Sequence, residues 1–297
     1  MHEAFVPVRT PYRLDLSAIV MRRLSTNVVD VFDGTAYRRL LGDPHDPVLL
    51  SVEQRAPDVL TARVEGSNTE SFDVAAIVRR ALGTEVDLSA FYAGAAAFPW
   101  LHEISTGARG VKPPRYPSLW ETIVNAVVYQ QVSIHAAGAI LRRVIERHSV
   151  PRELESGARL YPFPSARTIL DADPVQLRAL GLSINKVNSL TAVAAAIESG
   201  ELNESSLEPL STPALIEALV AHRGIGPWTG AVVALRGFGR LDIFPMNDSG
   251  ATASLRKLSG DPNVEAEPIV EALVPQQGML YYHLLLGRLN ATGEVSL

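Results

Sequence analysis

A short stretch at residues 222–230 combines the residue types needed to hold an anion with main-chain groups. It reads His-Arg-Gly-Ile-Gly-Pro-Trp-Thr-Gly and lies between two helical patterns. Glycine permits positive φ and lets another backbone come close. The N–H groups after the second glycine begin a helix, where free donors and the helix dipole favour a phosphate-like anion. The residues expected to form this anion site are Gly224, Ile225, Gly226, Trp228 and Thr229.

The same stretch has an alternative interpretation as an ordinary corner between two helices, and glycine spacing alone does not separate the two. Thr212-Pro213 before the first helix and Pro227-Trp228 at the start of the second favour the anion site. We also expect a structural monovalent cation, Na⁺ or K⁺, shared with the anion. Its ligands would be the main-chain carbonyls of Val220, His222 and Ile225. No cofactor is expected for catalysis.

One acid is well placed relative to the glycines. Asp248 follows Gly226 by 22 residues and directly precedes a helical pattern. Aspartate is among the best N-cap residues, so a purely structural role is an alternative. The two roles are compatible, because a helix N-terminus favours the negative charge that a carboxylate needs to stabilise a developing cation or to activate water. Asp242 is the competing acid, but its place before Ile243-Phe244 suits a turn better.

The elements that position the anion site fall into two regions of the chain. Residues 1–104 predict an α+β domain, an antiparallel sheet with helices on one face, because short alternating runs are separated by Gly, Pro and Asp. The expected strands are 28–32, 36–41, 48–53 and 60–65, and the expected helices lie near 16–24 and 72–82. Residues 105–117 are rich in Gly and Pro and predict a loop and a domain boundary.

Residues 105–297 predict an almost entirely helical region, with a helix-hairpin-helix at 212–237. Ser118-Leu119-Trp120-Glu121 has the spacing of a capping box. Ser133 and Asp173-Pro174 supply further helix starts. Other helices are expected at 185–199, 248–258, 268–274 and 277–289.

Composition sets limits on the class of protein. The 297 residues allow one to three domains, and the absence of cysteine excludes disulfides and cysteine-held metal clusters. No apolar run reaches about 18 residues and no secretory signal begins the chain, so we expect a cytoplasmic protein without membrane contact. A net charge of −5 counts mildly against a nucleic-acid partner. That objection weakens if backbone N–H groups and a cation meet the phosphates.

Taken together, the motifs resemble the helix-hairpin-helix, Gly/Pro-rich loop and aspartate superfamily of DNA glycosylases, and within it the DNA-3-methyladenine glycosylase II family. The similarity extends through nearly the whole chain. Its further motifs are Pro11-Tyr12, 129–133, 163–165, 173–174, 180–182 with Lys186, and 234–237. The resemblance implies an N-terminal sheet domain like half of the TATA-binding protein, two helical domains with a cleft between them, and a monomer that binds double-stranded DNA containing alkylated bases.

The resemblance also implies which chemistry is absent. Relatives that cut the DNA strand carry a lysine at the position of Trp228, and its amine forms a Schiff base with the sugar. An indole cannot do this, and the nearest lysines are Lys186 and Lys257. We therefore expect a monofunctional enzyme, with Asp248 as its catalytic residue, that releases an alkylated purine and leaves an abasic site. The face of Trp228 is expected to stack on a cationic base, although a simply packed aromatic is an alternative.

Two further sets of residues follow from the resemblance. Gln130 and Gln131 occupy an interhelical turn that in the family reaches the minor groove and fills the gap left by a flipped base; a solvated turn is the alternative. Val20, Val232 and Leu285 stand where a family member has aromatic residues. The predicted substrate pocket, formed by these three residues and Trp228, is therefore less aromatic, and the range of damaged bases stays open.

Two rival functions remain at this point. A glycosylase for oxidised or mismatched bases predicts a hairpin lysine or cluster cysteines, and both are missing from the sequence. A non-catalytic DNA-damage-binding protein would keep the hairpin without needing the acid, and the intact Asp248 argues against it.

Overall fold

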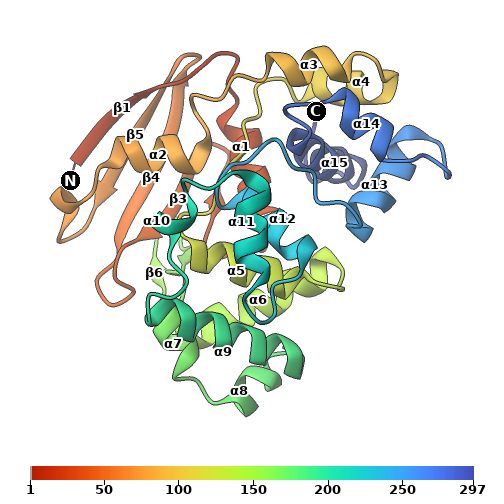
Figure 1. The fold of residues 1–297 in the computed structure, drawn as a ribbon. Coiled ribbons are helices and arrows are strands. Elements are labelled where there is room, and N and C mark those ends of the chain that lie inside the picture. The colour runs from red at the N-terminus through yellow and green to blue at the C-terminus, as the bar shows by residue number, and fades with distance from the viewer. Residues whose placement is uncertain (1) are drawn as a thin grey trace.

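The computed structural model describes residues 2–297. Its N-terminal part is built on an antiparallel sheet with strand order β1-β5-β4-β3-β2 (Figure 1). Alternate residues of the central strands point to one face and pack against two helices, as the period-2 pattern predicts. The α+β prediction is therefore confirmed. The elements are β1 (His2–Pro7), α1 (Leu14–Arg22), β2 (Val31–Phe32), β3 (Ala36–Leu41), β4 (Val48–Ala56), β5 (Val59–Glu65), the 3₁₀ turn η1 (Thr69–Ser71) and α2 (Val74–Leu82).

Two helices that the sequence pattern did not indicate follow the sheet. They are α3 (Ser89–Ala95) and α4 (Pro99–Gly107). Their apolar residues pack with α1 and with the last helices of the chain rather than with the sheet. The loop predicted from residue 105 thus begins only after Gly107, and the predicted boundary at residue 104 falls inside α4. Burial of Phe91 and Leu101 against the C-terminal helices explains the difference.

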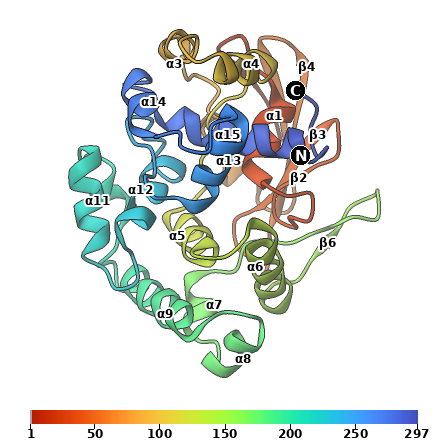
Figure 2. The ribbon, with the colours of Figure 1, turned by 90° about the vertical axis from the view of Figure 1, so that its right-hand side faces the viewer.

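The rest of the chain is helical, as predicted, apart from a small hairpin formed by β6 (Arg152–Glu153) and β7 (Arg159–Leu160). Figure 2 shows α1 beside α15, between the sheet and the C-terminal helices. Within residues 2–297, no helix combines the length and apolar character needed to cross a bilayer. The helices are α5 (Leu119–Tyr129), α6 (Ile134–His148), α7 (Ala166–Leu170), α8 (Pro174–Ala179), α9 (Ile184–Glu198), α10 (Glu204–Leu207), α11 (Thr212–Val220), α12 (Pro227–Arg236), α13 (Ser249–Ser259), α14 (Glu267–Ala272) and α15 (Gly278–Ala291).

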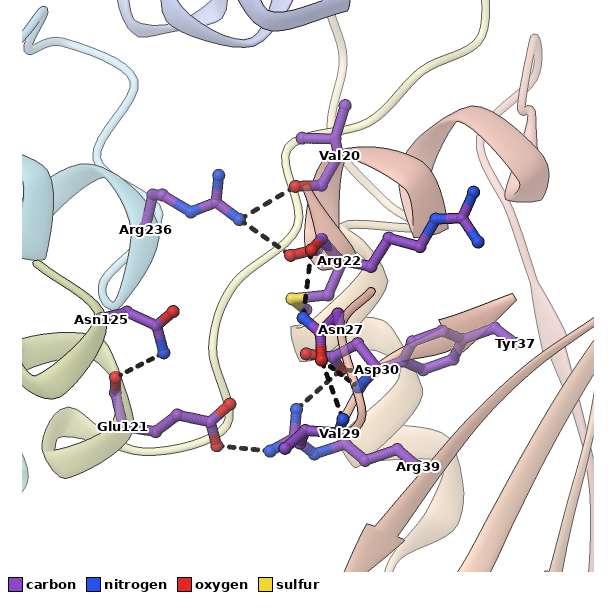
Figure 3. A network of polar contacts seen from close by, with 11 residues as sticks. Val20, Arg22, Asn27, Val29, Asp30, Tyr37, Arg39, Glu121, Asn125 and Arg236 are labelled. Atoms are coloured by element: carbon purple, nitrogen blue, oxygen red, sulfur yellow. Dashed lines mark hydrogen bonds and ion pairs between the residues drawn. The ribbon is translucent and has the colours of Figure 1, made fainter. Parts of the chain in front are cut away.

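A buried ionic network joins the sheet to α5. Ser118 caps α5 by accepting from the N–H of Glu121, as the capping-box spacing predicts. The Glu121 side chain, however, turns away and accepts from Arg39 of β3, which also donates to Asp30 at 2.7 Å (Figure 3). All three charged side chains are buried. One cation thus holds two carboxylates from different elements, which fixes α5 against the sheet.

Candidate active site and nucleic-acid interface

The hairpin between α11 and α12 has the close packing that its glycines predict. Gly224 has φ +92°, and a Cβ there would lie 2.2 Å from the Oγ of Ser189 on α9. Gly226 is the N-cap of α12, and a Cβ there would meet nothing within 4 Å. The first glycine is therefore required by the fold, whereas the second leaves an open surface above the start of α12.

The N-terminus of α12 offers donors at this open surface. The first helical hydrogen bond of α12 runs from Gly230 N to Gly226 O, at 2.9 Å. The N–H groups of Trp228 and Thr229 precede it, so the helix itself does not use them. Backbone donors at a helix N-terminus suit an anion such as a phosphate. The predicted anion site at residues 224–229 is consistent with this geometry.

Asp248 is held at the start of α13 and faces the hairpin helix. Its Oδ1 caps α13 by accepting from Ala251 N at 2.8 Å. Its Oδ2 accepts from the indole Nε1 of Trp228 at 3.0 Å and from the hydroxyl of Tyr281 at 3.3 Å. Three elements, α12, α13 and α15, thus fix one carboxylate, and the side chain stays partly exposed. The expected N-cap role and the expected chemical role are both compatible with this arrangement.

Trp228 has a contact that the sequence did not indicate. Its indole edge donates to the carboxylate of Asp248, so this side chain orients the acid. Stacking of the indole face on a base stays a prediction. Tyr281 also proves to be part of the site, although its position in a long apolar helix gave no clear signal. Burial raises the pKa of Tyr281 to about 12, so its hydroxyl stays a donor at neutral pH.

The other residues predicted for the substrate pocket lie in different surroundings. Val20 on α1 and Val232 on α12 are fully buried in separate apolar clusters. Neither presents an open wall to a base in this structure, and their contact with substrate stays a prediction. Leu285 is half-buried, one turn after Tyr281 on α15. His283 is buried, and desolvation lowers its pKa to about 4, so it does not serve as an acid at neutral pH.

The turn after α5 is anchored on one side and free on the other. Gln130 donates from Nε2 to the Oγ1 of Thr229, at 2.7 Å, which ties the turn to α12. Lys186 caps α5 by donating to the carbonyls of Val128 and Gln130, at 2.8 and 2.9 Å. Gln131 is exposed and has φ +55°, a conformation that a non-glycine residue rarely adopts. The geometry thus separates Gln130, which braces the turn, from Gln131, which forms its tip.

The carbonyl of His222 and the competing acid Asp242 have defined partners. The carbonyl of His222 accepts from Ile225 N at 3.2 Å, and a carbonyl oxygen has a second lone pair that suits a cation. Asp242 is exposed and accepts from the hydroxyl of Thr212 at 2.9 Å. Asp242 therefore helps to fix the start of α11, whereas the acid at the hairpin helix is Asp248.

The comparison with protein families decides the class of this protein. The family described as HhH-GPD superfamily base excision DNA repair protein matches residues 124–276, which include the second half of α5, the hairpin and Asp248. The chain belongs to this superfamily. In this HhH-GPD protein the matched residues contain the hairpin between α11 and α12 and the acid that its first helical turn contacts.

Individual relatives agree with this assignment. The chain is 29% identical over 267 residues to a probable bifunctional transcriptional activator/DNA repair enzyme AlkA of Mycobacterium tuberculosis; the match covers 85% of this chain and 50% of that relative. It is 28% identical over 193 residues to a DNA-3-methyladenine glycosylase of Bacillus subtilis, covering 64% of this chain and 62% of that relative. The chain thus spans about half to three fifths of the length of these curated relatives.

Solved structures share the fold of this HhH-GPD protein over nearly its whole length. A 3-methyladenine DNA-glycosylase from Archaeoglobus fulgidus superposes with a TM-score of 0.78 at 22% identity, covering 96% of this chain and 98% of that one. Because this superposition includes both the sheet and the helices, the predicted order of the two regions is confirmed. The fission-yeast glycosylase Mag1, solved in complex with abasic DNA, matches 70% of this chain and 97% of its own with a TM-score of 0.56 at 25% identity.

Arg236 ties the hairpin helix to the N-terminal part, a role that its place in the motif at 234–237 did not indicate. Arg236, at the end of α12, is fully buried and donates from Nη2 to the carbonyl of Val20 at 3.1 Å (Figure 3). Its guanidinium also lies over the rings of Tyr116 and Tyr282. A single arginine in an apolar helix is a weak signal, because its partners come from distant parts of the chain. Arg236 thus fixes the last turn of α1 relative to the site.

Proposed function

We propose that this protein is a monofunctional DNA glycosylase that acts on alkylated purines of the 3-methyladenine type in duplex DNA. It flips the damaged nucleotide into the site and hydrolyses the N-glycosidic bond, which leaves an abasic site. The observation that carries the proposal is the carboxylate of Asp248, held at 3.0 Å from the indole nitrogen of the hairpin residue Trp228. Support also comes from the relatives named as 3-methyladenine glycosylases.

The proposed reaction relies on charge stabilisation by Asp248. An N-alkylated purine is cationic, so it leaves as a neutral molecule when its bond to C1′ breaks. The sugar then develops oxocarbenium character, and a nearby carboxylate stabilises this positive charge, as in glycoside hydrolysis. Asp248 accepts the proton of the attacking water. Trp228 and Tyr281 hold the Oδ2 of Asp248 in place for both steps.

A pathway that cuts the DNA strand requires an amine at the sugar, and the lysines near the site are placed for other roles. Trp228 stands at the hairpin position of that amine. The Nζ of Lys186 is engaged by two carbonyls at the end of α5, which supports a structural role. We therefore propose hydrolysis without strand cleavage.

DNA binding is proposed to use the hairpin and the turn after α5. The N–H groups at the start of α12 would hold a phosphate, together with a Na⁺ or K⁺ ion bound by the carbonyls of Val220, His222 and Ile225. Gln131, exposed at the tip of its turn, would enter the minor groove and fill the space of the flipped base. One copy of the chain contains all of these elements, so we propose that it acts as a monomer.

The test is base release from methylated duplex DNA. The wild-type protein is expected to release 3-methyladenine, measured by chromatography, and to leave strands that break only after alkali treatment. Asp248→Asn keeps an N-cap residue, so the variant should fold, yet its rate should fall by about 10²-fold or more. Asp242→Asn is the matched control and should retain activity. Tight DNA binding without base release would instead support a damage-binding protein, and strand breakage without alkali would refute the monofunctional assignment.

A further inference from the structure

Arg288 is a cation near the proposed catalytic carboxylate, and the reaction described above does not use it. It lies on α15, which packs against α13 (Figure 2). Tyr281, Leu285 and Arg288 follow one another at intervals of four and three residues, so they share one face of α15. On this face Tyr281 donates to Asp248. Arg288 therefore continues, toward the end of the helix, the face that meets the acid.

Gly250 locates the guanidinium of Arg288 relative to the acid. This glycine is in the first turn of α13, two residues after Asp248. A Cβ on Gly250 would lie 3.2 Å from the Oδ1 of Asp248 and 3.9 Å from the Nη1 of Arg288. The carboxylate and the guanidinium thus both reach the same residue, which has no side chain to cover them. They do not form an ion pair, since no carboxylate among residues 2–297 lies within 4 Å of Arg288.

The N–H donors of Arg288 are unused within the described part of the chain. Its main-chain carbonyl accepts from Thr292 N at 3.2 Å, but its side chain donates to no acceptor among residues 2–297. The residue as a whole is half-buried, while its guanidinium nitrogens remain open to solvent. Arg236, at the end of α12, instead donates to a backbone carbonyl of α1. The donors of Arg288 are therefore available for an acceptor that comes from outside the chain.

The DNA backbone supplies such an acceptor next to the sugar. Each sugar of the strand is joined to two phosphates, so a sugar that reaches Asp248 brings a phosphate close to that carboxylate. The two negative groups repel each other, and the net charge of −5 on the chain adds to the repulsion. A guanidinium beside the acid offsets this cost. Its planar fork also matches two oxygens of one phosphate, which a single ammonium group does not.

We propose that Arg288 binds one of the two phosphates that flank the flipped nucleotide. This inference rests on the proposed function, because it names a further DNA contact of the same Asp248 site. The contact holds the sugar so that its C1′ faces the carboxylate, and it carries no information about the base, since every nucleotide has the same phosphates. It follows from the unused donors of Arg288 and from the position of its guanidinium at Gly250.

The test removes the charge of each partner in turn. Duplexes carry an abasic-site analogue at the target position, and a neutral methylphosphonate replaces its 5′ phosphate, its 3′ phosphate or neither. Kd is measured on the three duplexes for wild type and for Arg288→Gln, after Tm has confirmed that the variant is folded. Arg256→Gln is the matched control, because Arg256 is an exposed arginine in the last turn of α13, about two helical turns from Asp248. Arg288→Lys tests whether charge without the fork is sufficient.

The expected result is a loss that the two changes share. On the unmodified duplex, Arg288→Gln should raise Kd by about tenfold and reduce the slope of log Kd against log salt by about 0.9, because one phosphate contact is lost. At one of the two phosphates, the methylphosphonate should raise Kd by about tenfold for wild type but less than about twofold for Arg288→Gln. Arg256→Gln should respond to the methylphosphonate as wild type does. Arg288→Lys should keep the salt slope and lose part of the affinity.

Equal penalties for wild type and Arg288→Gln at both phosphates would show that Arg288 contacts neither of them and would overturn the proposal. A loss of the same size in Arg256→Gln would assign the effect to general attraction by surface charge and would overturn it as well. Base release from methylated DNA is measured on the same wild-type preparation. Release combined with equal penalties would overturn this inference alone, whereas a wild type that releases no base would overturn the proposed function.

Discussion

The two hairpin glycines should respond in opposite ways to the same substitution. Gly224→Ala places a side chain at φ +92°, where its Cβ would lie 2.2 Å from Ser189 Oγ and 3.0 Å from Ser189 Cα. Gly226→Ala places a side chain at φ −90°, with nothing within 4 Å. The first change therefore disturbs the fold of the hairpin, and the second changes only the surface that is proposed to meet a phosphate.

The size of the effect at Gly224 follows from two terms. A left-handed conformation costs an alanine about 1–2 kcal/mol. Overlap with Ser189, whose backbone belongs to α9, adds about 1–3 kcal/mol, because a helix cannot move as freely as a flexible side chain. The sum of about 2–5 kcal/mol lowers Tm by roughly 3–8 °C in a chain of this size. At Gly226, a weaker N-cap and a stiffer unfolded chain nearly cancel, so Tm should stay within about 2 °C.

Thermal unfolding and DNA affinity, measured together, distinguish the two roles. Gly224→Ala should lose both stability and affinity for an abasic duplex. Gly226→Ala should keep its Tm but bind roughly tenfold more weakly, because its methyl group comes between the phosphate and the N–H groups of α12. A Ser189→Gly background removes the Oγ and Cβ that Gly224→Ala would overlap, so the same substitution should destabilise that background by at least about 1 kcal/mol less.

Two outcomes would refute this reasoning. A Gly224→Ala protein with wild-type Tm would show that the hairpin does not pack on α9 as described. A Gly226→Ala protein that binds DNA with unchanged affinity would show that the start of α12 is not where the phosphate lies. Additive effects of Gly224→Ala and Ser189→Gly would locate the strain elsewhere.

Three further predictions concern the acid, the turn and the buried network. Trp228→Phe keeps a ring but loses the donor to Asp248, so single-turnover base release should fall by about 10-fold or more while DNA affinity stays within threefold; equal rates would refute an orienting role. Gln131→Ala should keep Tm and slow base release, since the side chain is exposed; a large fall in Tm would contradict this. Burial, helped by Asp30, raises the pKa of Glu121 from 4.5 to about 7, so ionised Glu121 weakens the fold as pH rises between these values. Glu121→Gln should therefore flatten the loss of unfolding free energy, on the order of 1–3 kcal/mol, between pH 5 and 8 in urea titrations; an unchanged slope would assign the pH dependence to another group.

Local signals account for what the sequence predicted correctly. Strands β4 and β5 lie close to where the sequence predicts them, because alternate residues such as Leu50 and Val52 of β4 and Leu60 of β5 pack into one apolar core. Helices α5, α6 and α13 begin directly after Ser118, Ser133 and Asp248, each of which accepts a hydrogen bond as an N-cap. The fixed spacing from Gly226 to the acid places Asp248 at the hairpin helix. These features depend on a few neighbouring residues, so short stretches of the sequence are sufficient to predict them.

Features that depend on distant partners were not predictable in this way. The edge strand β1 was missed, since its side chains are mostly exposed and show little alternation. Helices α3 and α4 contain alanine, glycine and proline and become stable through burial against α15 and α13. Tyr281 belongs to the site because α15 packs against α13, which begins directly after Asp248. The sequence Tyr281-Tyr282-His283 does not show by itself which of these side chains reaches the acid.

The packing of α3 and α4 against the last helices affects how the chain folds during synthesis. The strands of the sheet and α2 come from the first 82 residues, and Tyr116 completes their apolar core soon after. The apolar residues of α3 and α4, including Phe91 and Leu101, are only partly covered, by α1 and its neighbours, until α13 and α15 have been made. A nascent chain that stalls near residue 240 therefore exposes this surface, and such intermediates are prone to aggregation. Ribosome-bound fragments that end before α13 should consequently depend on chaperones, whereas the sheet domain folds early beside them.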